Sequence, residues 1–223
     1  LLGGLERRVR SAFSARADVA ARPFLANLGH AVVAATASAA LVVGFTVLLR
    51  TTTPEAEFLR SAPFILAISV TRAPLLVPLT AYQGVAIAHF LERRTEGIRP
   101  LLRVVALVAT AGVLAALAAA ALGRWLMVAL FGPEYAVPAL ELAALTLAGA
   151  LLAVITLSGA AALALGQHRA FAAGWVVAAL VAIGVLLLPM AIEPRAILSL
   201  MVGPVVGATV HIAAIATSTA GRR

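Results

Sequence analysis

Long apolar runs separated by short polar turns constrain the fold of this chain more than any other feature. Each run is long enough to supply the roughly 20 residues that a helix needs to cross a bilayer. Inside a membrane, a chain segment of this kind satisfies its backbone hydrogen bonds as a helix. The sequence therefore predicts an all-α membrane protein, a single bundle over 25–223 with no soluble domain of its own. About six transmembrane helices are expected, over 25–49, 58–90, 104–131, 136–165, 170–190 and 196–217.

Composition agrees with this interpretation. Hydrophobic residues make up 63% of the chain, charged residues 12%, and the mean hydropathy is +1.07. A soluble domain carries about 25% charged residues, so this chain has too little polar surface to cover itself in water. The net charge is +8, and every basic residue is an arginine. The arginines fall mostly between apolar runs rather than on one soluble face, so we expect a lipid bilayer and no nucleic acid as partner.

Residues 1–24 form a basic segment ahead of the first apolar run. Leu1, Leu5, Val9 and Phe13 recur every four residues, as in a helix that lies on the membrane surface. A solvated linker explains the pattern equally well. The segment lacks the features of a signal peptide. Because the chain begins with Leu1 rather than methionine, we expect its natural start to lie further upstream.

The arginines also predict how the chain crosses the membrane. Cytoplasmic loops retain positive charge. If the runs alternate in direction, most arginines fall on the side that holds both chain ends, the 91–103 loop and the 166–169 turn. We therefore expect a multi-pass protein of the plasma membrane with both termini in the cytoplasm. The opposite side would carry Arg50, Arg60, Arg124 and Arg195.

Arg72 stands near the middle of the second run. A charge at that depth costs at least about 2.5–3.5 kcal/mol, so it usually faces water or a partner inside the bundle. Helical spacing places Ser61 and Gln83 on the face of Arg72, with Ser69 and Thr80 on the same broad side. The functional interpretation is an aqueous path that attracts an anion.

The alternative interpretation is an arginine that backbone carbonyls or a buried carboxylate satisfy internally. Glu141, near the outer end of the fourth run, is the one credible carboxylate within the apolar runs. The second run also contains Pro63, Pro74 and Pro78, each of which removes a backbone donor. A tilted or broken helix is therefore expected there, as is common at transporter binding sites.

No pattern of residues predicts catalysis. The sequence contains no paired acids on one helix, nucleophile motif, glycine-rich phosphate loop or metal-ligand spacing. The histidines lie on different segments near predicted membrane edges, where structural roles are expected: His30, His89, His168 and His211. We therefore expect no cofactor, no metal and no enzyme activity.

Three short motifs resemble the polysaccharide-exporting flippases of the multidrug/oligosaccharidyl-lipid/polysaccharide transporter superfamily. The first is the SVTRAP segment at 69–74, in which an arginine closely precedes a proline. The others are the LFGPEYA turn at 130–136 and the ALGQHR turn at 164–169. The resemblance covers about 24–217 and extends only to the C-terminal lobe of such a transporter.

The resemblance implies a fold of two six-helix lobes around a central cavity, which admits the diphosphate and sugars of a polyprenyl-linked intermediate. In related lipid II flippases, an arginine on the matching helix is associated with the anionic head group, and Arg72 takes that role here. Ser69, Thr80 and Gln83 are inferred neighbours from helical geometry. The first lobe has no counterpart in this chain, so a missing N-terminal lobe or a partner chain would have to supply it.

The sequence thus favours the C-terminal half of a flippase that moves an anionic lipid-linked saccharide for cell-envelope polysaccharide export. One alternative is a cation-coupled multidrug antiporter of the same superfamily, in which Glu141 would have to bind the coupling ion. Another is a non-transporting membrane subunit of an envelope-synthesis complex, in which Arg72 pairs internally. A membrane-bound glycosyltransferase or other enzyme would need acidic clusters in its loops, and none is seen.

Overall fold

The computed structural model describes residues 21–220, apart from the side chains of 21, 75–83, 94, 219 and 220. Every regular element in this part of the chain is a helix, which confirms the all-α class. The α-helices are α2 (Ala21–Val42), α3 (Phe45–Thr51), α4 (Glu55–Arg60), α5 (Ala62–Glu92), α6 (Arg99–Phe131), α7 (Ala139–Ala164), α8 (His168–Leu186) and α9 (Ile192–Ala220). Two 3₁₀ turns, η1 (Arg94–Glu96) and η2 (Pro133–Tyr135), lie in the loops.

Five helices are long and apolar enough to cross a membrane. They cover 22–42, 99–131, 139–164, 168–186 and 192–218. α5 has 31 residues, a sufficient length for a sixth crossing, and the apolar part of it that the structure describes is Ala62–Pro74. These helices agree with a multi-pass membrane protein. Of the basic segment predicted over 1–24, only the last four residues are described, and they form the start of α2.

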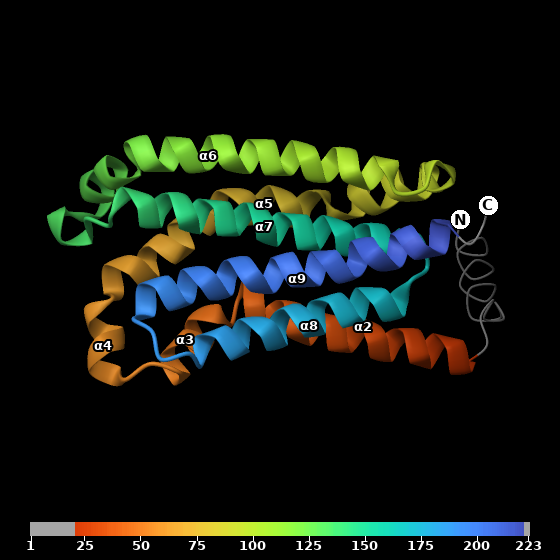
Figure 1. The fold of residues 1–223 in the computed structure, drawn as a ribbon, viewed down its shortest axis with the longest axis horizontal. Helices are drawn as coiled ribbons and strands as arrows, with labels where there is room; N and C mark the ends of the chain where they lie inside the picture. The colour runs from red at the N-terminus through yellow and green to blue at the C-terminus, as the bar shows by residue number, and fades with distance from the viewer. Residues whose placement is uncertain (1–20, 221–223) are drawn as a thin grey trace, which may run out of the picture.

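The helices form one elongated bundle with α7 at its centre (Figure 1). α6 and α5 pack on α7, α9 packs on both α7 and α8, and α2 packs on α8. The start of α2 and the end of α9 lie at the same end of the bundle. This arrangement is compatible with the even number of crossings that the sequence predicts, whichever side of the membrane that end occupies.

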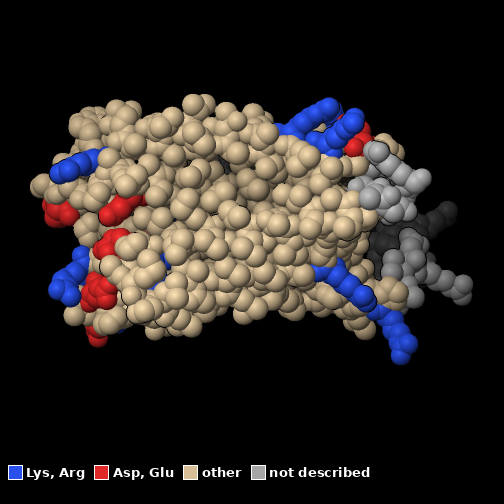
Figure 2. Space-filling view, viewed as in Figure 1, with Lys and Arg blue, Asp and Glu red and all other residues tan. Residues whose placement is uncertain are grey.

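Charged side chains gather at the two ends of the bundle and leave the visible face between them almost entirely uncharged (Figure 2). The end that holds α4 carries both arginines and glutamates, whereas arginines predominate at the other end among the described residues. A belt without charge is the surface expected next to lipid tails.

The hydrophobic core lies along α7 and includes its small and aliphatic side chains. Leu145, Leu152 and Ile155 are almost fully buried, and Ala148 and Ala160 allow neighbouring helices to approach closely. α6, by contrast, exposes leucines along most of its length. One apolar helix is thus enclosed by protein while another of similar composition faces outward.

In two of the predicted membrane segments the helix is interrupted at a position that the sequence does not predict. The first run is interrupted at Val43–Gly44, between α2 and α3. The second is interrupted at Ser61, and the short α4 lies across the end of the bundle (Figure 1). α5 itself remains helical through Pro74 and Pro78. Proline lacks a donor, but its backbone angle φ suits a helix, so it can be accommodated when tertiary packing supports the helix.

Candidate functional site

Arg72 lies three turns into α5, with its side chain directed into the bundle. Only 6% of its surface is exposed. The guanidinium Nη2 donates to the Leu41 carbonyl at 3.4 Å, and the guanidinium carbon lies 5.3 Å from the centre of the Phe45 ring. The Nε donor is buried and has no hydrogen-bond partner among the described residues. Arg72 therefore retains unused capacity to donate a hydrogen bond.

The break between α2 and α3 creates this environment. The N–H groups of Val43 and Gly44 both donate to the Ala39 carbonyl, at 2.9 and 2.8 Å, which ends the regular pattern of α2. The last carbonyls of a helix lack backbone partners and carry the negative end of its dipole. Leu41 supplies one of these carbonyls, so Arg72 acts as a cation at the C-terminal end of α2.

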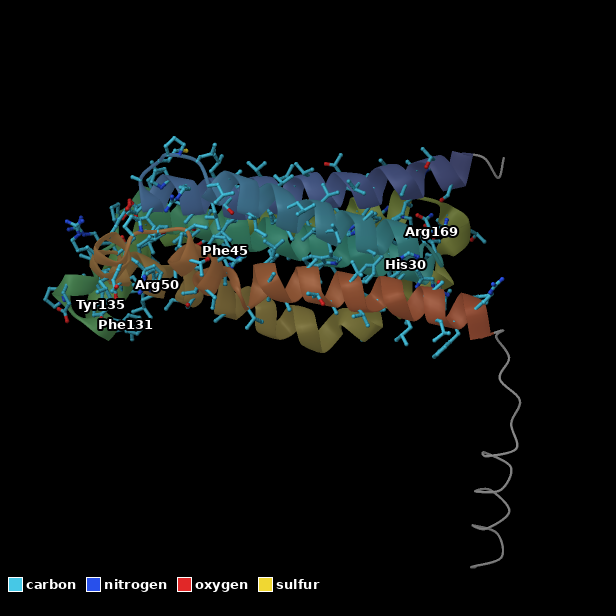
Figure 3. The ribbon with its side chains drawn as sticks, turned by 90° about the horizontal axis from the view of Figure 1, so that it is seen from below. His30, Phe45, Arg50, Phe131, Tyr135 and Arg169 are labelled. Carbon is cyan, nitrogen blue, oxygen red and sulfur yellow. The ribbon has the colours of Figure 1, made fainter. Side chains whose placement is uncertain are left out.

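Phe45 begins α3 immediately after the break and is 1% exposed. Figure 3 shows it deeper in the bundle than Arg50, which lies toward the end that holds Phe131 and Tyr135. An aromatic face attracts a cation when both are shielded from water. Phe45 therefore gives the Arg72 guanidinium an attractive surface without neutralising its charge.

No carboxylate neutralises Arg72 within the part of the chain that the structure describes. The ion pairs seen there join Arg50 to Glu55, and Arg93 and Arg103 to Glu96. Glu141, the sequence's candidate partner, lies in the first turn of α7 and makes no ion pair with Arg72. Among the described residues the positive charge of Arg72 is therefore uncompensated, and such an environment suits an anion.

Ser69 lies elsewhere. Its side chain is exposed and its hydroxyl is 3.5 Å from the Ile65 carbonyl. It lines an open groove of about 360 Å³ together with Phe58, Leu59, Ala62, Ile65, Leu66 and Tyr135. The structure therefore does not bring Ser69 and Arg72 together, because one faces out of the bundle and the other faces in. The side chains of Thr80 and Gln83 lie outside the described residues.

Ser61, the residue that precedes α5, is buried like Arg72, but the interruption there means that the two do not share one continuous helix. Its hydroxyl lies 3.3 Å from a carboxylate oxygen of Glu193, at the start of α9. Nearby, Glu57 accepts a hydrogen bond from the Ile192 backbone N–H at 3.2 Å. A carboxylate at this position satisfies an N-terminal donor of α9 and complements the helix dipole.

Sequence reasoning missed Arg195 as a buried residue. The sequence predicts that Arg195 ends a short turn before the last span, but α9 begins at Ile192 and includes it. Arg195 is 7% exposed and donates through Nη2 to the Thr53 hydroxyl at 2.8 Å. Its Nε is buried and has no partner in the part of the chain that the structure describes. No local pattern distinguishes it from the exposed arginines, since its burial depends on the loop after α3.

His211 differs from the other histidines in its burial within the protein, which the sequence does not indicate. Its side chain is fully buried among α7, α8 and α9. Among the described residues, no group of three or more histidines, cysteines or carboxylates could hold a metal ion.

Comparison with known proteins finds mycobacterial relatives. One from Mycobacterium tuberculosis, carrying the name uncharacterized protein, is 47% identical over 193 residues, which cover 86% of this chain and 44% of the relative. A second from the same organism, also an uncharacterized protein, is 44% identical over 207 residues, or 93% of this chain and 48% of the relative. A Mycobacterium bovis protein matches to the same extent as the first.

The chain thus spans about half the length of the curated relatives it matches. No protein-family description matches it, and no solved structure does.

Proposed function

We propose that this chain is the C-terminal half of a flippase that moves polyprenyl-diphosphate-linked oligosaccharide across the plasma membrane for envelope polysaccharide export. In this proposal both termini are cytoplasmic, and an N-terminal lobe or partner chain completes the path. The chain moves its substrate without chemical change, so it is a transporter and not an enzyme.

The observation that carries the proposal is the environment of Arg72. Its charge is buried and unpaired among the described residues, and Nε has no partner. A guanidinium binds diphosphate oxygens through parallel charge-assisted hydrogen bonds. The contact with Leu41 is long at 3.4 Å, against about 2.9 Å for a typical N–H···O bond. An anionic head group would therefore replace a weak contact rather than a strong one.

The length of the relatives supports a half-transporter. They are about twice as long as the part that this chain matches. A single bundle supplies one wall of a path across the membrane, whereas alternating access requires two parts that move against each other. The remaining part of such a protein is the natural second wall.

One alternative has a specific observation in its favour. Arg72 contacts the Leu41 carbonyl and the Phe45 ring, both within the bundle. A non-transporting membrane subunit of an envelope-synthesis complex would need only these internal contacts, with Arg72 serving to stabilise the break between α2 and α3.

The test compares three substitutions introduced into the chromosomal gene. Arg72→Ala should lower export of the surface polysaccharide by at least about tenfold, because losing about 1.4 kcal/mol of anion binding corresponds to that factor. Arg72→Lys should lose part of the activity, since it keeps the charge but not the planar fork. Arg124→Ala, at an exposed arginine of α6, serves as the matched control and should leave export unchanged.

Export is measured as surface polysaccharide together with accumulation of its lipid-linked precursor, and the amount of protein in the membrane is measured in parallel. Normal export by Arg72→Ala at a normal membrane level would rule out the transport role. Loss of the protein from the membrane, with export restored when expression is raised, would favour the non-transporting subunit.

A further inference from the structure

A buried imidazole joins three helices of the bundle. His211 of α9 is fully buried. Its Nε2 lies 3.1 Å from the Phe171 carbonyl of α8, and its Nδ1 lies 3.0 Å from the Ser158 hydroxyl of α7. The Phe171 ring stacks on the imidazole, with 6.2 Å between ring centres and 16° between planes.

Two glycines provide the space for this ring. A Cβ on Gly174 of α8 would overlap the imidazole, and one on Gly159 of α7 would lie 3.3 Å from its Cε1. Because side chains are absent at both positions, the imidazole reaches polar atoms on two neighbouring helices. The positions of its two nitrogens are therefore determined by backbone packing.

The partners of the ring determine where protons can lie. The Phe171 carbonyl can only accept, so Nε2 carries a hydrogen in either charge state of the ring. The Ser158 hydroxyl has one hydrogen and two acceptors within reach, since its oxygen also lies 3.0 Å from the Ile155 carbonyl. The arrangement of hydrogens at Nδ1 is consequently not determined by the heavy atoms.

Two complete hydrogen-bond patterns are compatible with the same positions of the heavy atoms. In the neutral ring, the Ser158 hydroxyl donates to Nδ1. When a proton from the aqueous phase binds the Nδ1 lone pair, Nδ1–H donates to the Ser158 oxygen, and the hydroxyl turns to donate to the Ile155 carbonyl. Every donor in the protonated pattern has an acceptor, which reduces the cost of burying the charge.

The helices around His211 bring few charges to it. Beyond His211, α9 has no titratable side chain between Ala196 and Ala220, and α7 has none between Leu142 and Ala164. The titratable groups nearest in sequence to its α8 contacts are His168 and Arg169 in the first turn of that helix. Among the described residues, those on the other elements at the same end of the bundle are Arg22 and His30 of α2, His89 and Glu92 of α5, Arg93, Arg94 and Glu96 at η1, and Arg99 and Arg103 of α6.

We propose that His211 is a proton-binding site inside the bundle. Binding of the proton at Nδ1 reverses the hydrogen bond with Ser158 and links α9 through that hydroxyl to the Ile155 carbonyl of α7. A purely structural histidine would instead keep the neutral ring with a bare Nδ1. The site is independent of the proposed substrate, because none of its atoms belongs to the surroundings of Arg72.

The direct test is nuclear magnetic resonance of the full chain in lipid nanodiscs, with ¹⁵N in the histidine rings. The His211 signals are assigned by their loss in His211→Gln, whose side-chain amide can still donate to Phe171. Between about pH 9 and about pH 4, which brackets the ordinary histidine pKa, Nδ1 should change from bare to protonated while Nε2 stays protonated. A ring that keeps a bare Nδ1 down to about pH 4 would overturn the proposal.

A matched pair of variants tests the role of Ser158. Ser158→Ala removes the acceptor of the new N–H and should lower proton affinity by about tenfold or more, as expected for loss of a charge-assisted hydrogen bond. Ser199→Ala also removes a fully buried hydroxyl, one that donates to the Ala182 carbonyl away from His211, and should leave the titration unchanged. Equal titration curves for the two variants would contradict the hydrogen bond between His211 Nδ1 and Ser158. If either variant fails to fold, the titration of the wild-type chain still tests the proposal.

Discussion

At the scale of single residues, Arg72 shows how a buried charge is accommodated. Its guanidinium lies at the C-terminal end of α2 and over the Phe45 ring. Both the helix dipole and the ring quadrupole favour a cation at this point. They partly offset the cost of burial while leaving the positive charge available.

Phe45 and Arg72 should therefore be energetically coupled. In a double-mutant cycle of Phe45→Leu and Arg72→Ala, we expect a coupling of about 0.5–2 kcal/mol in the free energy of unfolding. The measurement is unfolding by dodecyl sulphate in mixed micelles, followed by circular dichroism.

Phe64→Leu provides the control for this cycle. Phe64 is 3% exposed and belongs to the same core cluster as Phe45. Its substitution should lose similar packing but show coupling to Arg72→Ala below about 0.5 kcal/mol. Coupling of equal size for both phenylalanines would contradict a specific contact between Arg72 and Phe45.

The sequence alone is enough to single out Arg72 as a candidate site residue. It does not predict which residues surround Arg72 in the fold. A charge in the middle of an apolar run is visible without a structure. Its contact with Leu41 requires that α2 end beside α5, and helical spacing alone could not separate the buried Arg72 from the exposed Ser69. Thr80 and Gln83 stay predictions.

At the scale of helices, close approach depends on a few small residues. Gly112 of α6 faces Ala150 of α7, and a Cβ on Gly112 would overlap the Cβ of that alanine. The helices can therefore pack at this distance only while position 112 is glycine.

Gly112→Ala should destabilise the bundle by about 1–3 kcal/mol, since the added methyl group forces α6 away from α7. Gly84→Ala is the matched control, because no described atom outside its own helix backbone lies within 4 Å of the position that its Cβ would occupy. That change should be neutral or stabilising by up to about 1 kcal/mol, from the preference of helices for alanine. Unfolding in mixed micelles measures both, and equal effects would contradict the packing of α6 on α7.

The helix breaks were only partly accessible to sequence reasoning. Three prolines predict a tilted or broken helix in the second run, yet α5 is continuous through Pro74 and Pro78. The first run breaks at Val43–Gly44, where hydropathy shows no interruption. A membrane helix can break wherever neighbouring groups satisfy the freed backbone, and Arg72 does so at Leu41.

At the scale of the whole molecule, the distribution of charge leads to a prediction about orientation. The end with the start of α2 and the end of α9 has mainly arginines among the described residues, while the end with α4 mixes both signs (Figure 2). Positive charge is retained on the cytoplasmic side, so the α4 end should face outward.

Cysteine labelling can test this orientation without background, because the chain contains no cysteine. Thr51→Cys, exposed at the end of α3, should react with a membrane-impermeant maleimide in intact cells. Thr95→Cys, exposed in η1, should react only after the cells are opened. The reverse pattern would show that the arginine distribution predicts the wrong orientation.

From the sequence alone follow the helical class, the long apolar segments and the position of Arg72 within one of them. These follow from local properties, because the length and hydropathy of a run, and a charge within it, do not depend on the remainder of the chain. The tertiary structure alone decided that α7 occupies the centre, that Arg72 meets the end of α2, and that His211 joins three helices. Hydropathy does not distinguish helices that are almost equally apolar. Which of them become neighbours depends on close packing between particular small residues.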